Sequence, residues 1–440
     1  MKQMKQGLIL LCICTMMLYI AACSGNSNNA STSETSTSTP VSSTTTKPAE
    51  KVTINFAYRV DTTKTKDKLI DKFNKSQDAI EVKYIDATAD TNEFRNLIVT
   101  SLAAGMSEYD VYGSDITWPA EFYQSEYALA LDRMVERDNY DVSAFIPGLI
   151  DAYTYKGSLV GLPYFNNVGV LFYRTDIVKT PPTTWDELIE MGKKYVGTNG
   201  TTLAFAGEGA QYEGLVCGAM EFIGSYGGKI IDENGKVVIN SPEVIKGLEK
   251  MREVWHEICP TNMSTLKNAD ITSLLQGGQT VFARMWPMTW AEVNNPEKSK
   301  AAGLYDIAML PGSEKGGVGT GSLGGWGLMI NAKSEHPNEA WEFMKFMLSE
   351  ESQKTNAIEG GLMPTRLSLY KDADVIKSYP VIGKLYDIAA AGITRPVTPV
   401  YARISEVMQI EISKMIGGEQ TAQEAVNVME KKMNEIIAEK

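Results

Sequence analysis

Residues 52–58 read VTINFAY, and this stretch begins the pattern that decides the fold. Apolar and polar side chains alternate in β-branched and aromatic company, which predicts a strand. Two more strands are predicted at residues 81–85 and 109–112. The segments between them carry helical apolar stripes, made by Leu69, Ile70 and Phe73 and then by Phe94, Leu97, Ile98 and Leu102. Strands that alternate with helices predict an α/β fold with a mostly parallel sheet.

Asp115 follows the third predicted strand at its carboxyl end. Ligands of open α/β sheets bind beyond the carboxyl ends of the strands. The position alone therefore makes Asp115 a candidate for a ligand contact.

The same pattern continues through the rest of the chain. Residues 168–173 and 327–330 are predicted strands, and helices are predicted at 185–194, from 337, at 406–416 and at 422–437. About 390 residues follow residue 51, which is too many for one core and suits two lobes.

The amino terminus has the features of an export signal. Lys2 and Lys5 precede an apolar run from Leu8 to Ile20, which is too short to cross a bilayer. The sequence Ile20-Ala21-Ala22-Cys23 resembles a bacterial lipoprotein box, so residues 1–22 are interpreted as a signal peptide and Cys23 as the lipidated first residue. A plain signal cleaved after Ala22 is the alternative.

Residues 23–51 are interpreted as a flexible tether behind the lipid. Of the 27 residues 24–50, 15 are Ser or Thr and none is aromatic, so the segment cannot bury enough apolar surface to offset its ordering entropy. After removal of the signal, 40 basic residues stand against 54 acidic ones. This balance argues against nucleic acid or anionic lipid as a partner.

Few residues are available for metal or nucleophile chemistry. The chain has two histidines, His256 and His336, so neither a histidine-built metal site nor a serine-type triad is expected. Cys217 and Cys259 could form one disulfide, although a fold of this size does not need one. No catalytic residue, metal or cofactor is predicted, but carboxylates are too numerous for a glycosidase pair to be excluded by counting.

One glycine pattern has two readings. Gly319 to Gly324 fits G-x-G-x-x-G, yet it leads into a predicted strand, whereas a nucleotide site needs a helix there. The glycines are better explained by a close backbone approach, to a ligand or at a crossing between lobes.

The tryptophans indicate a sugar. Trp118, Trp286 and Trp326 lie at predicted strand ends or loops, as does Trp290, which is assigned to the core. Each could be a core anchor. Alternatively, indole faces stack on sugar rings while carboxylates and guanidinium groups bond the hydroxyls.

Three segments strongly resemble family 1 extracellular solute-binding proteins, the receptors of sugar ABC importers: residues 155–164, 170–176 and 182–188. A closer resemblance, to the trehalose/maltose-binding branch, is carried by residues 109–119, 323–326, 362–366 and 395–399. It implies a two-lobe, type II periplasmic-binding-protein-like fold whose hinge-connected lobes close on a ligand.

The resemblance also implies roles for particular residues. Asp115 would accept sugar hydroxyl bonds, Gly325 and Trp326 would give a backbone contact and a stacking face, Arg395 would donate, and Trp286 would form a second wall. The remaining implied contacts are Phe165, Asn167, Met288 and, more weakly, Asp61, with Arg95 weaker still. Asn167 and Met288 depart from the branch, which tends to have an aspartate and an aromatic residue there.

The implied lobes are residues 52–164 with about 312–362, and residues 165–311 with about 363–440. The implied function is capture of a disaccharide such as trehalose, maltose or sucrose, and its delivery to the permease subunits of an ABC importer. The protein is expected to be a monomer on the extracellular face of a Gram-positive type membrane, held there by its lipid alone. A receptor for a non-sugar solute such as a peptide, and a surface polysaccharide-active enzyme, remain the alternatives.

Overall fold

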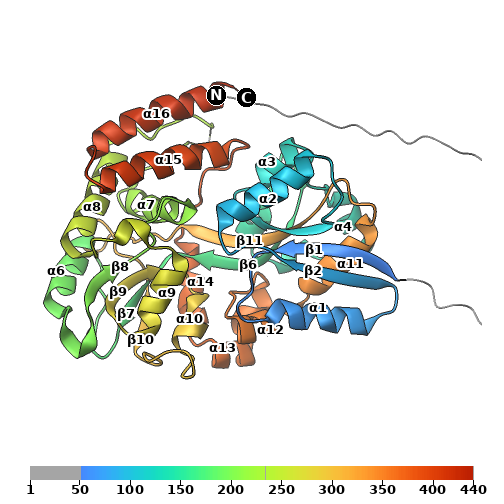
Figure 1. Ribbon diagram of the computed structural model, residues 1–440, viewed down its shortest axis with the longest axis horizontal. Coiled ribbons are helices and arrows are strands. Elements are labelled where there is room, and N and C mark those ends of the chain that lie inside the picture. The colour runs from blue at the N-terminus through green and yellow to red at the C-terminus, as the bar shows by residue number, and fades with distance from the viewer. Residues whose placement is uncertain (1–50, 233, 440) are drawn as a thin grey trace, which may run out of the picture. The chain divides into compact units, whose positions relative to one another are not determined.

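A computed structural model describes residues 51–232 and 234–439 (Figure 1). The predicted signal peptide, Cys23 and almost all of the tether lie outside the described residues. In the described part, no helix combines the length and the apolar character needed to cross a membrane.

The first of two main sheets has five strands in the order β2-β1-β3-β11-β6. Their bounds are β1 Val52–Tyr58, β2 Ile80–Asp86, β3 Val111–Asp115, β6 Leu162–Val168 and β11 Leu323–Ile330. The predicted first strand is confirmed in full. The alternation in β1 buries Ile54 and Phe56 completely, and β1 pairs in parallel with both β2 and β3.

Helices that flank this sheet bury most of the stripes predicted from the sequence: Leu69, Ile70, Phe73, Phe94, Ile98 and Leu102 are all buried in one core. The prediction was wrong for Leu97, which is exposed. Their bounds are α1 Thr65–Ser76, α2 Thr91–Ala103, α3 Pro119–Gln124, α4 Asp132–Asp138, α5 Pro147–Ala152, α11 Pro337–Met347 and α12 Glu350–Gly360. A small hairpin of β4 Thr154–Tyr155 and β5 Ser158–Leu159 completes this part.

The second sheet has four strands in the order β10-β7-β9-β8. Their bounds are β7 Val170–Arg174, β8 Leu203–Ala206, β9 Thr280–Met285 and β10 Tyr305–Ala308. The neighbouring helices are α6 Trp185–Tyr195, α7 Glu213–Ser225, α8 Pro242–Ile258, α9 Asn268–Gln276, α10 Thr289–Val293, α13 Ala373–Ser378, α14 Ile382–Ala390, α15 Tyr401–Ile416 and α16 Ala422–Ala438. Two further apolar cores lie in this part.

Two predictions about strands were wrong. The sheets are mixed, because β11 runs antiparallel to both β3 and β6, and β7 runs antiparallel to β9 and β10. The predicted strand 168–173 is interrupted at Gly169, so that β6 belongs to the first sheet and β7 to the second.

The predicted boundary between the lobes, after residue 164, lies inside β6.

The chain crosses between the sheets where the backbone is unusually close to itself. A Cβ on Gly321 would lie 2.3 Å from the carbonyl oxygen of Gly169, and one on Gly319 would lie 1.6 Å from that of Leu310. The glycine pattern therefore serves close packing next to β11. Cys217 and Cys259 are both free, so no disulfide joins them.

We expect Gly321→Ala to destabilise the protein by about 1–3 kcal/mol, because the new methyl overpacks a backbone contact that cannot rotate away. Urea unfolding followed by circular dichroism measures this change. The control is Gly383→Ala in α14, where a Cβ meets nothing within 4 Å and the helix gains propensity. Equal stability of the two variants would contradict the crossing as a packing constraint.

Candidate functional site

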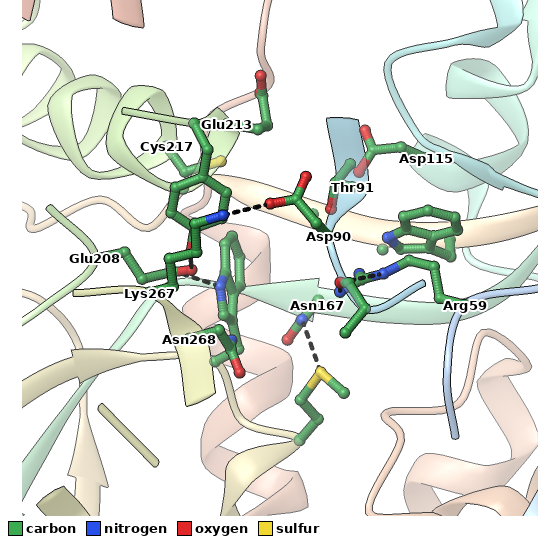
Figure 2. A pocket seen from close by; sticks show the side chains of 18 of the residues that line it. Arg59, Asp90, Thr91, Asp115, Asn167, Glu208, Glu213, Cys217, Lys267 and Asn268 are labelled. Carbon is green, nitrogen blue, oxygen red and sulfur yellow. Dashed lines mark hydrogen bonds and ion pairs between the residues drawn. The ribbon is translucent and has the colours of Figure 1, made fainter. Parts of the chain in front are cut away.

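A cavity of about 410 Å³ lies between residues within or beyond strands of the first sheet and residues from the part of the chain that forms the second sheet and its helices. From the first come Arg59, the segment 88–91, Asp115 and Trp326; from the second come Glu208, Tyr212, Glu213, Cys217, Lys267, Asn268, Trp286 and Met288. Phe165, Asn167, Gly324 and Gly325 line it from the crossing, together with Arg395. Figure 2 shows the labelled side chains of these segments around one space.

Asp115 is the last residue of β3 and pairs with Arg395, whose Nη2 lies 3.1 Å from its Oδ1. The other guanidinium arm donates to Glu213, the first residue of α7, at 2.7 Å. Burial alone would lower the pKa of Arg395, but Asp115 and other nearby acidic groups hold it well above its ordinary value. The arginine is therefore a permanent cation bound between two carboxylates.

A second buried ion cluster supports the opposite wall. Arg284 in β9 donates to Glu221 at 2.8 Å and to Glu208 at 2.6 Å, and all three side chains are buried. Glu208 also accepts from the indole N–H of Trp286 at 2.8 Å, and the Arg284 guanidinium lies 4.1 Å from the Trp286 ring centroid. The cluster thus fixes the plane of a half-buried indole in the cavity wall.

Glu221 ties this cluster to the crossing between the sheets. Its carboxylate accepts from the backbone N–H of Ser322 at 3.1 Å, and burial raises its pKa even though Arg284 lowers it. The hydroxyl of Ser322 donates to the Cys217 carbonyl at 2.8 Å. Burial also raises the pKa of the Cys217 thiol, so it stays protonated at neutral pH.

Trp326 is more deeply packed than a simple stacking platform. It is 4 % exposed, and its ring lies 5.2 Å from that of Trp118 and 5.7 Å from that of Phe94. The guanidinium of Arg59 covers it at 4.9 Å. Trp326 therefore belongs to the core and to the cavity lining at once.

The crossing segment places Asn167 and Gly325 in the lining. Gly325 has a φ of 122°, and a Cβ there would lie 2.6 Å from the Phe165 carbonyl oxygen, so glycine is required. The Oδ1 atom of Asn167 is buried without a hydrogen-bond partner among the described residues. Its Nδ2 has only the sulfur of Met288, at 3.9 Å.

An ion pair joins the two sides of the cavity. Asp90 caps the start of α2 by accepting from the backbone N–H groups of Asn92 and Glu93, and Lys267, just before α9, donates to it at 2.7 Å (Figure 2). Burial alone would raise the pKa of Asp90, but the hydrogen bonds from Lys267 and from the backbone lower it below its ordinary value.

Eight of the nine residues proposed from the sequence line this cavity, including Asp115, Trp326 and Arg395. Asp61 does not: it is buried against Lys66, with Oδ2 3.6 Å from Nζ, and it accepts from the backbone N–H of Lys66 in the first turn of α1. Arg95 is paired with Glu121 in a neighbouring cavity.

Several lining residues were missed, among them Arg59, Asp90, Glu208, Glu213 and Lys267. The strand-end rule that identified Asp115 could have found three of them. Arg59 follows β1, Asp90 lies four residues beyond β2, and Glu208 lies two residues beyond β8. Glu213 and Lys267 lie at helix starts, and no local sequence signal identifies them.

The chain is similar to known proteins over most of its length. Residues 58–354 match the family described as bacterial extracellular solute-binding protein. A Deinococcus radiodurans protein named "Probable ABC transporter-binding protein" is 33% identical over 336 residues, covering 74% of this chain and 79% of the relative.

Two solved structures show the same fold. The maltose-bound MalE3 of T. maritima has a TM-score of 0.82 and 33% identity, covering 88% of this chain and all of the other. A solute-binding protein from Agrobacterium radiobacter K84 in complex with ribitol has a TM-score of 0.80 and 23% identity over 89% of this chain.

We expect Arg284→Met to lower the free energy of unfolding by about 3–5 kcal/mol near neutral pH, because Glu208 and Glu221 lose their buried counter-charge. Without the arginine, the burial that already raises the pKa of Glu221 is no longer opposed by a cation. The folded state then binds protons more readily than the unfolded one, so the loss shrinks as the pH falls from about 8 to about 5.

Urea unfolding at several pH values measures this loss. The control is Arg403→Met, which removes an exposed arginine paired with exposed Glu439 and should cost less than about 1 kcal/mol. A pH-independent loss in Arg284→Met would contradict the role of Arg284 as the counter-charge of the buried Glu221 carboxylate.

Proposed function

Because this chain belongs to the family of bacterial extracellular solute-binding proteins, which serve ABC transporters, we propose that it captures a neutral sugar of about disaccharide size and delivers it to the permease subunits of an importer. The ligand is held in the cavity between the two sheets, in contact with Asp115, Phe165, Asn167, Trp286, Met288, Gly325, Trp326 and Arg395.

The observation that carries the sugar assignment is a pair of buried polar atoms that have no hydrogen-bond partner among the described residues. The buried Nε of Arg395 and the buried Oδ1 of Asn167 both have no hydrogen-bond partner among the described residues, and both side chains line the cavity. One is a donor and the other an acceptor. Buried polar groups are costly when unpaired, and a ligand with several hydroxyls can donate to one and accept from the other.

The charge of the lining favours a neutral ligand over an anionic one. Five carboxylates line the cavity (Asp90, Glu93, Asp115, Glu208 and Glu213), against three cations (Arg59, Lys267 and Arg395). The two cations Arg395 and Lys267 already contact carboxylates. A phosphate or carboxylate ligand would therefore meet excess negative charge in a partly desolvated site.

The aromatic lining suits a ring. Trp286 is held by Glu208 on its edge and by Arg284 over its ring, and an indole fixed in this way is a rigid surface for the apolar face of a sugar. The cavity of about 410 Å³ lies near the small end of ligand pockets, which run from about 300 to 1,000 Å³. A disaccharide, like the maltose in the T. maritima relative, is of suitable size.

The proposed lobes follow the two sheets: residues 52–168 with about 312–362, and residues 169–311 with about 363–440. Closure of these lobes on the ligand is the proposed conformational step, with the crossings at Gly169 and Gly321 as the hinge. The protein is further proposed to be a monomeric lipoprotein, anchored through Cys23 on the extracellular face of a Gram-positive type membrane.

The proposed role includes no catalysis. The central carboxylates Asp115, Glu208 and Glu213 all accept hydrogen bonds from an arginine in the cavity wall, so they do not form a free pair of carboxyl groups of the kind that a glycosidase uses. A reducing-end assay with maltose, maltotriose and starch tests this directly. If reducing ends appear at a rate that scales with protein concentration, the protein is an enzyme and the assignment as a receptor is wrong.

A small solute with a quaternary ammonium group is the second candidate, favoured by the same excess of carboxylates and by the indole rings of Trp286 and Trp326. Glycine betaine and choline are its probes.

Calorimetric titration should give micromolar or tighter binding for at least one of trehalose, maltose and sucrose. Asn167→Leu and Trp286→Ala should each weaken that binding at least tenfold, about 1.4 kcal/mol, because one removes an unpaired acceptor and the other a ring face. Asn427→Leu, on the exposed face of α16, is the control and should bind as the wild type does. Binding of betaine with no response to any sugar would rule out the sugar and favour the second candidate.

Lys267→Met should weaken sugar binding by up to about fivefold, because the Asp90 ion pair joins the two sides of the cavity and exposed pairs contribute about 0.2–1 kcal/mol. The same titration in low and high salt provides the measurement, since salt should weaken the wild type more than the variant. Lys193→Met removes an exposed pair with Glu257, away from the cavity lining, and should change nothing. If both variants bind alike, the ion pair has no part in closure.

A further inference from the structure

A second cavity, of about 430 Å³, adjoins the first and shares Thr91, Asp115 and Glu213 with it. Its other lining residues are Asn92, Arg95, Asn96, Thr117, Trp118, Glu121, Gln211, Tyr401, Ala402, Arg403, Ser405, Glu406 and Gln409. They come from α2, from the turn after β3, from α3, from the residues just before α7 and from α15. The two cavities are of similar volume and meet at the same two carboxylates.

The chemistry of the second cavity matches that of the first. Amides and hydroxyls dominate its lining, the guanidinium of Arg95 is paired with Glu121, and one indole, Trp118, contributes to the wall. Burial raises the pKa of Glu121 even though Arg95 lowers it. Such a lining suits sugar hydroxyls as well as the first cavity does.

A wall of hydrogen-bonded side chains lies between the two spaces. Asp115, Arg395 and Glu213 form a continuous bridge, with distances of 3.1 and 2.7 Å. On the β3 side, Asp115 is held by the backbone N–H and hydroxyl of Thr117, at 3.0 and 2.8 Å. The bridge therefore spans from the end of the first sheet to the start of α7.

Glu213 fastens this wall at its far end. Its Oε1 accepts from the Tyr401 hydroxyl at 2.6 Å as well as from Arg395, and its Oε2 accepts from Ser405. One carboxylate thus holds the bridging arginine and two residues of α15. Without it, Arg395 keeps one anchor instead of two, and the Tyr401 hydroxyl loses the partner that orients it.

We propose that Glu213 sets the maximum chain length of the sugar, because its carboxylate closes the first cavity where the second begins. This inference rests on the proposed function and adds a specificity determinant to it. A ligand confined to the first cavity ends at the Asp115–Arg395–Glu213 wall. Opening the wall joins two polar spaces of similar size, so a longer chain gains room and partners for its additional hydroxyls.

The test is calorimetric titration with glucose, maltose, maltotriose, maltotetraose and maltopentaose. For the wild type we expect affinity to fall at least tenfold beyond one chain length, either the disaccharide or the trisaccharide. For Glu213→Ala we expect the ratio of maltotetraose to maltose affinity to rise at least tenfold. The double variant Glu213→Ala/Arg403→Ala should lose part of that gain, because Arg403 lines the second cavity.

Two matched variants distinguish the effect of opening the wall from general damage to the site. Glu213→Gln keeps the volume and a hydrogen-bonding oxygen, so the length limit should remain. Glu406→Ala trims the second cavity without touching the wall and should leave the limit unchanged. If Glu213→Ala does not unfold cooperatively, the wild-type series and Glu213→Ser decide instead.

Several results would overturn the inference. Wild-type affinity that is flat from maltose to maltopentaose means that no wall limits the ligand, and so does an unchanged ratio in a folded Glu213→Ala protein. Binding of trehalose or sucrose with no maltose-series ligand leaves the proposed function standing and removes the length limit. Binding of no sugar at all removes the proposed function first, and the length limit with it.

Discussion

The structure depends on close backbone packing at the place where the chain passes from the first sheet to the second and back again. The two passages touch, since Gly321 approaches the Gly169 carbonyl so closely that no side chain fits. Beside them, the buried carboxylate of Glu221 accepts from the Ser322 backbone and is neutralised by Arg284. The same arginine reaches Glu208, and Glu208 orients Trp286 in the cavity wall. The cavity wall and the crossing are thus parts of one charged network.

Local patterns predicted most of the elements, because strand alternation and helical stripes are properties of adjacent residues. Val52–Tyr58 and the buried faces of α1 and α2 follow directly from them. The direction of β11 could not be predicted, since its pairing with β3 and β6 joins residues far apart along the chain. The break at Gly169 was missed for a related reason. Apolar residues continue on both sides of it, and only the close approach of Gly321 makes a glycine necessary there.

The candidate site shows the same division. Strand ends identified Asp115, and the family resemblance contributed Trp286, Trp326 and Arg395. Neither the strand-end rule nor the resemblance could show which of these side chains bond to one another. Asp115 and Arg395, proposed separately as ligand contacts, are bonded to each other across 280 positions, and Glu213 completes the group. Asp61 was misjudged because a carboxylate after a strand can equally serve the next helix, and here Lys66 and the start of α1 engage it.

The two free thiols, Cys217 and Cys259, have a consequence for how the protein reaches its native state. Burial raises the pKa of both, and a protonated thiol reacts poorly with oxidants or with another disulfide. The described part of the chain can therefore fold without a thiol oxidase or a disulfide isomerase. It contains no disulfide for a reducing environment to break. Its stability comes from packing and buried charge pairs, so it should depend little on the redox state of the surroundings.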